Sequence, residues 1–350
     1  MAIYFKLIKK MKALKYILLL LLIAIIGFSI YVAVQPNDYK FSRSRTIEAP
    51  ISVLYNKVND FKEWPRFSPW MEQDREATIN YGNKTVGEGA SYSWSGEILG
   101  EGSMETLNTV EDSKINQKIE FIKPFEAKSN INWSFEPTPE GTKVTWGMEG
   151  EQDFMTKLFT TFTGSIEAGT GPDFERGLFK LDSVTQAEMK AYSIDVEGVT
   201  QHSGGYYLYK TTSCKLSDFQ KVMQQEFPKV GAYAIANNIT FAGAPFVLYE
   251  KWDEENNAVI FSTCIPTNSR IISNDSEILT GQLESFKAVK TILKGNYDNL
   301  REAWDKTMDY TNNNNLQIVE GGAMLEVYPT DPSRFPNPAD WKTEIYIEVE

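Results

Sequence analysis

The run from Tyr16 to Val34 contains 19 residues and no charged side chain. An α-helix rises about 1.5 Å per residue, so roughly 20 apolar residues cross the hydrocarbon core of a bilayer. A cleaved signal peptide has a shorter apolar stretch, about 7–15 residues, that ends in small side chains. Here the bulky Tyr31, Val32 and Val34 occupy most of those positions, and no cysteine follows nearby for lipid attachment. Residues 16–34 are therefore predicted to be a retained transmembrane helix.

The basic residues around this run favour one orientation. Residues 1–15 form a basic segment with five lysines, and only Lys40, Arg43 and Arg45 follow the run closely. Cytoplasmic flanks of membrane helices carry the excess of Lys and Arg. We therefore expect a single-pass protein with its N-terminus in the cytoplasm and its soluble body on the extracytoplasmic side.

The soluble body is acidic. The chain carries a net charge of −12 and its first 15 residues carry +5, so residues 16–350 carry −17. Such a body repels the phosphates of nucleic acid, so no nucleic-acid partner is expected. Two cysteines, Cys214 and Cys264, and one histidine, His202, fit no metal spacing, and we expect neither a metal nor a cofactor. The cysteines could pair outside the cytoplasm or remain buried thiols, and both interpretations stay open.

Residues 39–190 are expected to form a first domain. Pro50 can begin a helix without losing a needed N–H, and Ile51, Leu54 and Val58 follow it at helical spacing. Several later segments alternate apolar with polar residues, which indicates antiparallel strands with one buried face: residues 92–94, 131–135 and 144–148. A helical pattern ending at about Met189 closes the domain.

Residues 191–350 are expected to form a second domain with a faint internal duplication. The segments GAPFVLY (243–249) and GGAMLEVY (321–328) each place a tyrosine six residues after a glycine. A helical pattern precedes each segment, at 216–227 and 298–310, and another alternating strand follows it. The shared order predicts two halves, each strand–helix–strand–strand. The chain is then an α+β protein with one membrane helix and two soluble domains.

Tryptophans are concentrated in the first domain, which holds five of the eight: Trp64, Trp70, Trp94, Trp133 and Trp146. Aromatic side chains on the concave face of a curved sheet can line an apolar cavity. The alternative is that they only fill the core. Trp94, Trp133 and Trp146 lie on the predicted strands and are the candidate ligand-binding residues of this domain.

The second domain offers a different set of candidates: Glu344, Tyr346, Tyr249, Tyr328 and Glu326. Strand alternation places Glu344 and Tyr346 opposite Ile345, and places Glu326 with Tyr328. A sheet face with tyrosines and a carboxylate suits a groove for cationic aromatic or amphipathic molecules. A carboxylate there could also act as a general acid or base. The plainer interpretation is a set of outward-facing polar positions.

Residues 39–190 resemble the SRPBCC superfamily, the START and polyketide-cyclase-like helix-grip fold. The resemblance rests on RTIEAPISVLYNKVNDFKEWPRFSPW (45–70), the hairpin GEGASYSWSGEILGEGSMETL (87–107), WSFEPTPEGTKVTWGMEG (133–150) and the closing helix. It implies a curved antiparallel sheet, a long C-terminal helix and a deep apolar cavity for lipids or other hydrophobic molecules. It implies no defined catalytic set.

Residues 191–350 resemble the gyrase-inhibitor-like domain, which is also the effector-binding domain of bacterial multidrug-sensing regulators. The resemblance rests on GAPFVLYEKWD (243–253), LKGNYDNLREAWDKTMDY (293–310), the strand with Glu326 and Tyr328, and TEIYIEV (343–349). The family's groove acid matches Glu344, and some members are hydrolases that use such a glutamate with aromatic partners. The chain departs from the family at Glu348, where many members have proline, and it lacks a helix-turn-helix segment.

These observations favour a membrane-anchored binding protein for a hydrophobic or cationic amphipathic small molecule, without a DNA-binding module. One alternative is a hydrolase or cyclase that uses Glu344 with Tyr249 or Tyr346. Another is a lipid-handling or envelope-stress accessory protein. The sequence contains no Gly-x-Ser-x-Gly elbow, phosphate loop or dinucleotide fingerprint.

Overall fold

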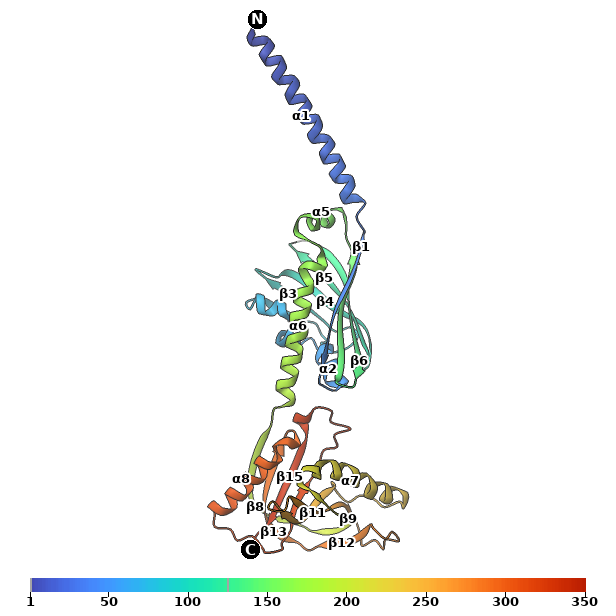
Figure 1. Ribbon diagram of the computed structural model, residues 1–350, viewed down its shortest axis with the longest axis vertical. Helices are drawn as coiled ribbons and strands as arrows, with labels where there is room; N and C mark the ends of the chain where they lie inside the picture. Colours follow the sequence, from blue (N-terminus) through green and yellow to red (C-terminus); the bar gives the residue numbers. More distant parts are fainter. Residues whose placement is uncertain (1, 125) are drawn as a thin grey trace. The chain divides into compact units, whose positions relative to one another are not determined.

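The computed structural model describes residues 2–124 and 126–350, with side chains from Leu14 onward. The chain divides into two compact units, one ending at Gln186 and the other spanning Ala187–Glu350, and each is described by itself (Figure 1). Each unit combines an antiparallel sheet with helices, which confirms the predicted α+β class.

Helix α1 (Ala2–Ala33) contains the apolar run. Its segment Leu14–Ala33 is long and apolar enough to cross a membrane, and nearly all of its side chains are exposed. A membrane anchor and a signal sequence both have these properties. The helix ends shortly before Pro36, which lacks the N–H that a continuing helix needs.

The first unit is built on a seven-stranded antiparallel sheet in the order β1-β7-β6-β5-β4-β3-β2. The strands are β1 (Asp38–Ile47), β2 (Thr78–Tyr81), β3 (Ser91–Gly96), β4 (Gly100–Val110), β5 (Lys114–Lys123), β6 (Ala127–Thr138) and β7 (Gly141–Glu151). The helices after α1 are α2 (Ile51–Asn59), α3 (Trp64–Phe67), α4 (Pro69–Gln73), α5 (Phe154–Thr163) and α6 (Ile166–Met189).

Helix α6 packs on the buried face of this sheet (Figure 1). On β6 the side chains of Ile131, Trp133 and Phe135 are buried and the residues between them are partly exposed, as the alternation predicts. The ring of Phe174 on α6 stacks on Trp146, with 4.1 Å between centroids. Gly177 permits this approach, because a Cβ there would lie 2.6 Å from Trp146 Cζ3.

The second unit is built on an eight-stranded antiparallel sheet in the order β12-β9-β11-β10-β14-β15-β13-β8. The strands are β8 (Ser193–His202), β9 (Gly205–Lys215), β10 (Phe246–Asp253), β11 (Ala258–Thr267), β12 (Leu279–Leu283), β13 (Phe286–Lys294), β14 (Met324–Val327) and β15 (Lys342–Glu348). Two α-helices, α7 (Phe219–Ala236) and α8 (Leu300–Asn313), pack on one face of the sheet.

The predicted duplication is confirmed by this strand order. One half is β9–α7–β10–β11 and the other is β13–α8–β14–β15, so each is strand–helix–strand–strand. The strands of the two halves occur in opposite order across the sheet and meet where β10 pairs with β14.

Helix α7 is longer than the sequence analysis predicts. It continues through Pro228 to Ala236 instead of ending at Phe227. A proline inside a helix removes one hydrogen bond and costs about 3 kcal/mol. Val230 and Ala234 are fully buried in one cluster with Leu208 and Ile265, and this burial offsets the cost.

Candidate binding sites

A cavity of about 1070 Å³ lies in the first unit. Its walls come from the sheet, from α4, from the turns after β3 and after β5, from α5 and from the start of α6. Most of the lining side chains are apolar or aromatic, and they include Trp70, Tyr92, Trp94, Ile119, Phe121, Ile131, Met148, Leu158, Phe159 and Phe162. A cavity with such walls holds apolar molecules by excluding their surface from water.

The three candidate tryptophans of this unit occupy different places. Trp94 lines the cavity, and its indole N–H donates to the Leu99 carbonyl at 3.3 Å. Trp133 and Trp146 lie within the core, stacked on one another with 4.4 Å between centroids. Trp70 also lines the cavity, and its indole N–H donates to Asp173 Oδ2 at 3.1 Å.

The cavity opens at one end of the sheet. Asp38 at the start of β1 pairs with Glu151 at the end of β7, and Gly150 pairs with Ser129 near the start of β6. The end of α1, the start of α5 and the turn between β5 and β6 therefore meet at this end. The exposed residues of the cavity wall all belong to it: Lys123, Pro124, Glu126, Ala127, Asp153, Met155, Phe159 and Phe162.

The polar groups of this cavity are poorly suited to acid–base chemistry. The Tyr39 hydroxyl hydrogen-bonds Ser129 Oγ at 2.6 Å, and burial raises the pKa of Tyr39. Burial likewise raises the pKa of Tyr92. The lining carboxylates Glu126 and Asp153 lie at the exposed mouth, where Asp153 accepts the Thr156 N–H at 2.7 Å and caps α5. The arrangement suits binding and not a reaction that needs a buried acid and base.

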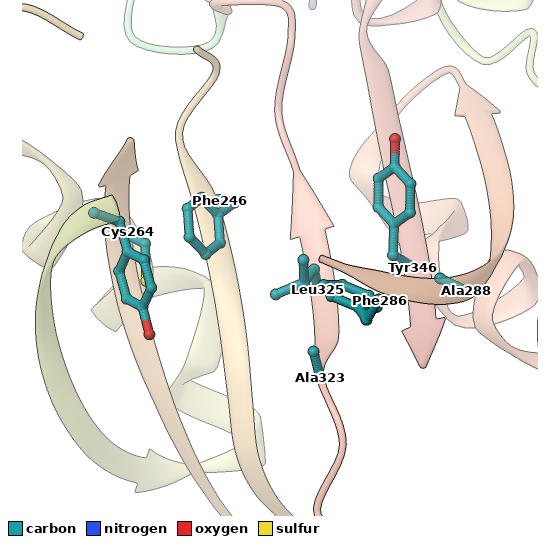
Figure 2. Close-up of a cluster of buried hydrophobic side chains, with 8 residues drawn as sticks. Phe246, Cys264, Phe286, Ala288, Ala323, Leu325 and Tyr346 are labelled. Atoms are coloured by element: carbon teal, nitrogen blue, oxygen red, sulfur yellow. The ribbon is translucent and has the colours of Figure 1, made fainter. Parts of the chain in front are cut away.

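In the second unit the candidate residues lie on opposite faces of the sheet. Tyr346 pairs with Leu325, and both belong to an apolar cluster with Phe246 on the face that α7 and α8 leave uncovered (Figure 2). Glu344 shares this face by alternation. Glu326 pairs with Ile345 and faces the helices, as do Tyr328 and Tyr249. The alternation within each strand is as predicted, but the five residues form two sites.

Glu344 is surrounded by basic partners. Its carboxylate accepts hydrogen bonds from Lys342 Nζ and from the Tyr346 hydroxyl, each at 2.7 Å, and Lys290 Nζ lies at 3.5 Å. Burial alone would raise the pKa of Glu344, but these donors and the two lysines lower it below the usual value. Glu344 is therefore a carboxylate anion whose negative charge is already compensated by the two lysines.

Glu326 lies in a very different environment. It is 2% exposed, and it accepts hydrogen bonds from the Trp304 indole at Oε1 and from the Tyr328 hydroxyl at Oε2. The Tyr249 hydroxyl also hydrogen-bonds it. Burial raises the pKa of Glu326, and the three hydrogen bonds oppose that rise. Within residues 14–124 and 126–350, no basic side chain forms an ion pair with it.

Aromatic rings surround this carboxylate. Tyr249 contacts Trp304 at 5.6 Å between centroids, and Tyr297 contacts Tyr328 at 5.5 Å. A buried carboxylate with aromatic walls and no cation is complementary to an organic cation, through Coulomb attraction and ring faces. Trp304 is not among the site residues predicted from the sequence. Its position on a predicted helix that packs on the sheet could have indicated a role in the site. An indole N–H that is buried against a sheet needs an acceptor there.

Two further expectations concern cysteines and metals. Cys214 and Cys264 are free thiols and do not pair in this structure, but only Cys264 is buried and Cys214 is partly exposed. Among the side chains from residue 14 on, apart from residue 125, no group of three His, Cys, Asp or Glu residues is placed to hold a metal ion.

Comparison with known proteins places both units in families. Residues 47–178 match the family described as polyketide cyclase / dehydrase and lipid transport, and residues 184–350 match the GyrI-like small molecule binding domain. A putative polyketide cyclase from Streptomyces cyaneus is 30% identical over 121 residues, which cover 32% of this chain and 70% of that protein. The chain belongs to the polyketide cyclase family and carries a GyrI-like domain. Both resemblances seen in the sequence are thereby confirmed.

Several solved structures are similar to part of the chain. The EcmrR C-terminal domain is 21% identical, with 45% of this chain and 98% of that one covered and a TM-score of 0.39. SAV2435 bound to tetraphenylphosphonium is 12% identical, with 46% and 94% covered and a TM-score of 0.35. SA2116 from Staphylococcus aureus is 12% identical, with 44% and 99% covered and a TM-score of 0.34.

Proposed function

We propose that this protein is a membrane-anchored binding protein that holds a hydrophobic small molecule in the cavity of its polyketide-cyclase-like unit. The observation that carries the proposal is the cavity itself, about 1070 Å³ with largely apolar and aromatic walls. Ligand pockets are commonly about 300–1,000 Å³, so this volume accommodates a molecule at the upper end of that range.

The way α1 joins the first unit supports a retained anchor. Val32 is fully buried, and Lys157 Nζ on α5 donates to the Gln35 carbonyl at 2.8 Å and to the Ala33 carbonyl at 3.4 Å. Ala33 ends α1, so its carbonyl has no partner within the helix, and Lys157 satisfies it together with the Gln35 carbonyl just beyond the helix. Lys157 is 5% exposed and also donates to Asn37 Oδ1, so cleavage of the helix would remove part of the acceptor set that holds this lysine. The lysines before the helix favour an extracytoplasmic body.

Native mass spectrometry of the detergent-extracted full-length protein tests the proposal. We expect an apolar molecule bound at one per chain. Ala127→Trp places a large ring at the mouth of the cavity and should reduce the bound fraction by about tenfold or more. Leu107→Trp is the matched control, because Leu107 is exposed on β4 and does not line the cavity. Equal occupancy in both variants, or a chain that takes up no apolar molecule, would overturn the proposal.

A second function is favoured by Glu326. We propose that the GyrI-like unit binds an organic cation at the Glu326 cluster, defined as Glu326, Tyr249, Tyr328 and Trp304. A buried carboxylate without a cationic partner gains more from a bound positive charge than one already paired with lysines. The cluster is closed in this structure, so a bulky cation enters only if α7 or α8 shifts.

Titration of the full-length protein with tetraphenylphosphonium separates the two candidate acids. Glu326→Gln keeps the shape of the side chain and removes its charge, so it should weaken binding by roughly tenfold or more. Glu344→Gln should have a much smaller effect, because Lys342 and Lys290 already compensate that charge. The reverse pattern would assign the cation to Glu344, as the sequence resemblance implies.

A further inference from the structure

We infer that α5 is a membrane-contacting helix and that the cavity beside it is filled from the bilayer. This inference rests on the proposed function, since it names the source and class of the ligand. The ligand is then a molecule dissolved in the lipid phase, such as one with an acyl chain, and not one taken up from water.

The depth of α5 follows from its contact with α1. The ring of Phe162, at the end of α5, lies 5.5 Å from the ring of Phe28 between centroids. Phe28 is five residues inside the end of the apolar segment at Ala33, which is about 7.5 Å along a helix axis. When α1 spans a bilayer, Phe162 therefore lies at the level of the lipid and not of bulk water.

The exposed face of α5 has the composition of an interfacial helix. Phe154 is 44% exposed, Met155 is 65% exposed and Phe162 is 75% exposed. Phe159 is 54% exposed, so this helix of ten residues has four exposed large apolar side chains, and such patches mark contact with a partner or a membrane. The body is acidic, so the contact relies on apolar burial and not on attraction to anionic headgroups.

The polar groups of α5 are satisfied internally. The hydroxyls of Thr160 and Thr161 donate to the Lys157 carbonyl at 3.2 and 2.7 Å, and Thr163 donates to the Phe159 carbonyl at 3.0 Å. Hydroxyls bonded in this way do not need water. The one cation of the helix, Lys157, points to the end of α1 and is also bonded there. The helix can therefore leave water at little polar cost.

The same helix forms the mouth of the cavity. Met155 and Phe162 line the cavity while remaining exposed, so one surface of α5 serves both the opening and the proposed bilayer contact. The turn between β5 and β6 completes the mouth at the same end of the sheet. An apolar molecule passes from lipid to cavity here without crossing water, and that lowers the barrier to its transfer.

The depth of α5 can be measured in the full chain. A bimane label at Phe162→Cys, in a Cys214→Ser and Cys264→Ala background reconstituted in phosphatidylcholine vesicles, should be quenched by brominated lipid and shielded from aqueous iodide. A label at Val110→Cys is the control. Val110 is 55% exposed but lies at the opposite end of β4, since Glu101 near the mouth pairs with Lys123. Iodide quenching at both positions, without quenching by brominated lipid, would overturn the inference.

The route of loading is tested with parinaric acid, whose emission reports energy transfer from Trp70 and Trp94 in the cavity wall. When the probe is supplied in vesicles, Phe162→Asp should slow loading by about tenfold or more, because a carboxylate resists entry into the lipid phase. Val110→Asp should leave it unchanged. Equal loading rates in the two variants would overturn the inference and leave the binding function standing. No transfer in any chain would instead overturn the binding function.

Discussion

Glu326 shows how one buried residue can matter for both stability and binding. Its carboxylate has an indole and two tyrosine hydroxyls as donors, but no cation among the side chains that the structure describes. Hydrogen bonds to a buried anion offset only part of the loss of water. The residue is therefore held in the fold at a cost, and a ligand with a positive charge would reduce that cost.

The contribution of Glu326 to the free energy of unfolding changes with pH, and the sign of that change can be measured. Burial raises the pKa of Glu326 above the ordinary glutamate value of 4.5. Its folded state then binds the proton more tightly than the unfolded state, so its contribution to stability is full below pH 4.5 and is lost as pH rises through the folded-state pKa. The loss is about 1.4 kcal/mol for each unit by which the two pKa values differ.

We therefore expect thermal unfolding of the full-length protein in detergent to show a pH-dependent difference between wild type and Glu326→Gln. Wild type should lose stability relative to the variant as pH rises above 4.5. Glu344→Gln is the control in which the pH dependence of stability has the opposite sign. The pKa of Glu344 is lowered, so its contribution to stability is lost as pH falls. A difference between wild type and Glu326→Gln that is constant with pH would contradict the assignment.

The tryptophans show what residue-level sequence reasoning could and could not predict. Trp94, Trp133 and Trp146 all alternate with polar residues, so each was predicted to point to the buried side of the sheet. Alternation predicts the face of the sheet on which a side chain lies, but not which part of that face α6 covers. The rings of Trp133 and Trp146 meet Phe174 and Trp64, whereas Trp94 lies beyond them at the cavity.

At the scale of elements, the order of strands and helices in the second unit was predictable and the assignment of faces was not. Period-two patterns on β14 and β15 correctly separate Glu326 from Leu325 and Glu344 from Ile345. Which of these faces the helices cover depends on the pairing register between strands. Leu325 pairs with Tyr346, and that pairing separates Glu344 from Glu326. No local pattern in the sequence specifies it.

Helix α5 is one of the elements that the sequence patterns do not predict. Its sequence, FMTKLFTTFT, is rich in threonine and phenylalanine, which have weak helix propensity. Tertiary contacts determine its conformation. Asp153 caps its N-terminus, Lys157 is bonded to the end of α1, and Phe162 contacts Phe28. The Asp153 cap is local, but the contacts of Lys157 and Phe162 join residues more than 120 positions apart, so a sequence window around α5 does not contain them.

At the scale of the whole molecule, the proposed function joins the membrane helix and the first unit in one task. Apolar molecules partition into a bilayer, so a binding site tethered at its surface meets them at a raised effective concentration. In the proposed function α1 supplies the tether, and the register of the first sheet brings the cavity mouth to the end of the sheet where α1 joins. Anchoring and binding are then two functions of one structural arrangement. The side of the membrane on which the body lies therefore matters for its function.

We expect the body to lie on the extracytoplasmic side with α1 retained. Intact mass of the membrane-extracted protein should include residues 1–36, and protease should digest the body in right-side-out vesicles but not in inverted ones. Replacing Lys9, Lys10 and Lys12 by glutamine reduces the lysines before the helix from five to two, against three basic residues after it. Because positive charge determines orientation, this variant should insert in both directions. Lys221→Gln, in the second unit, should not change the orientation. Digestion of wild type only in inverted vesicles would reverse the assignment, and a mature chain starting near residue 36 would show that α1 is a signal sequence.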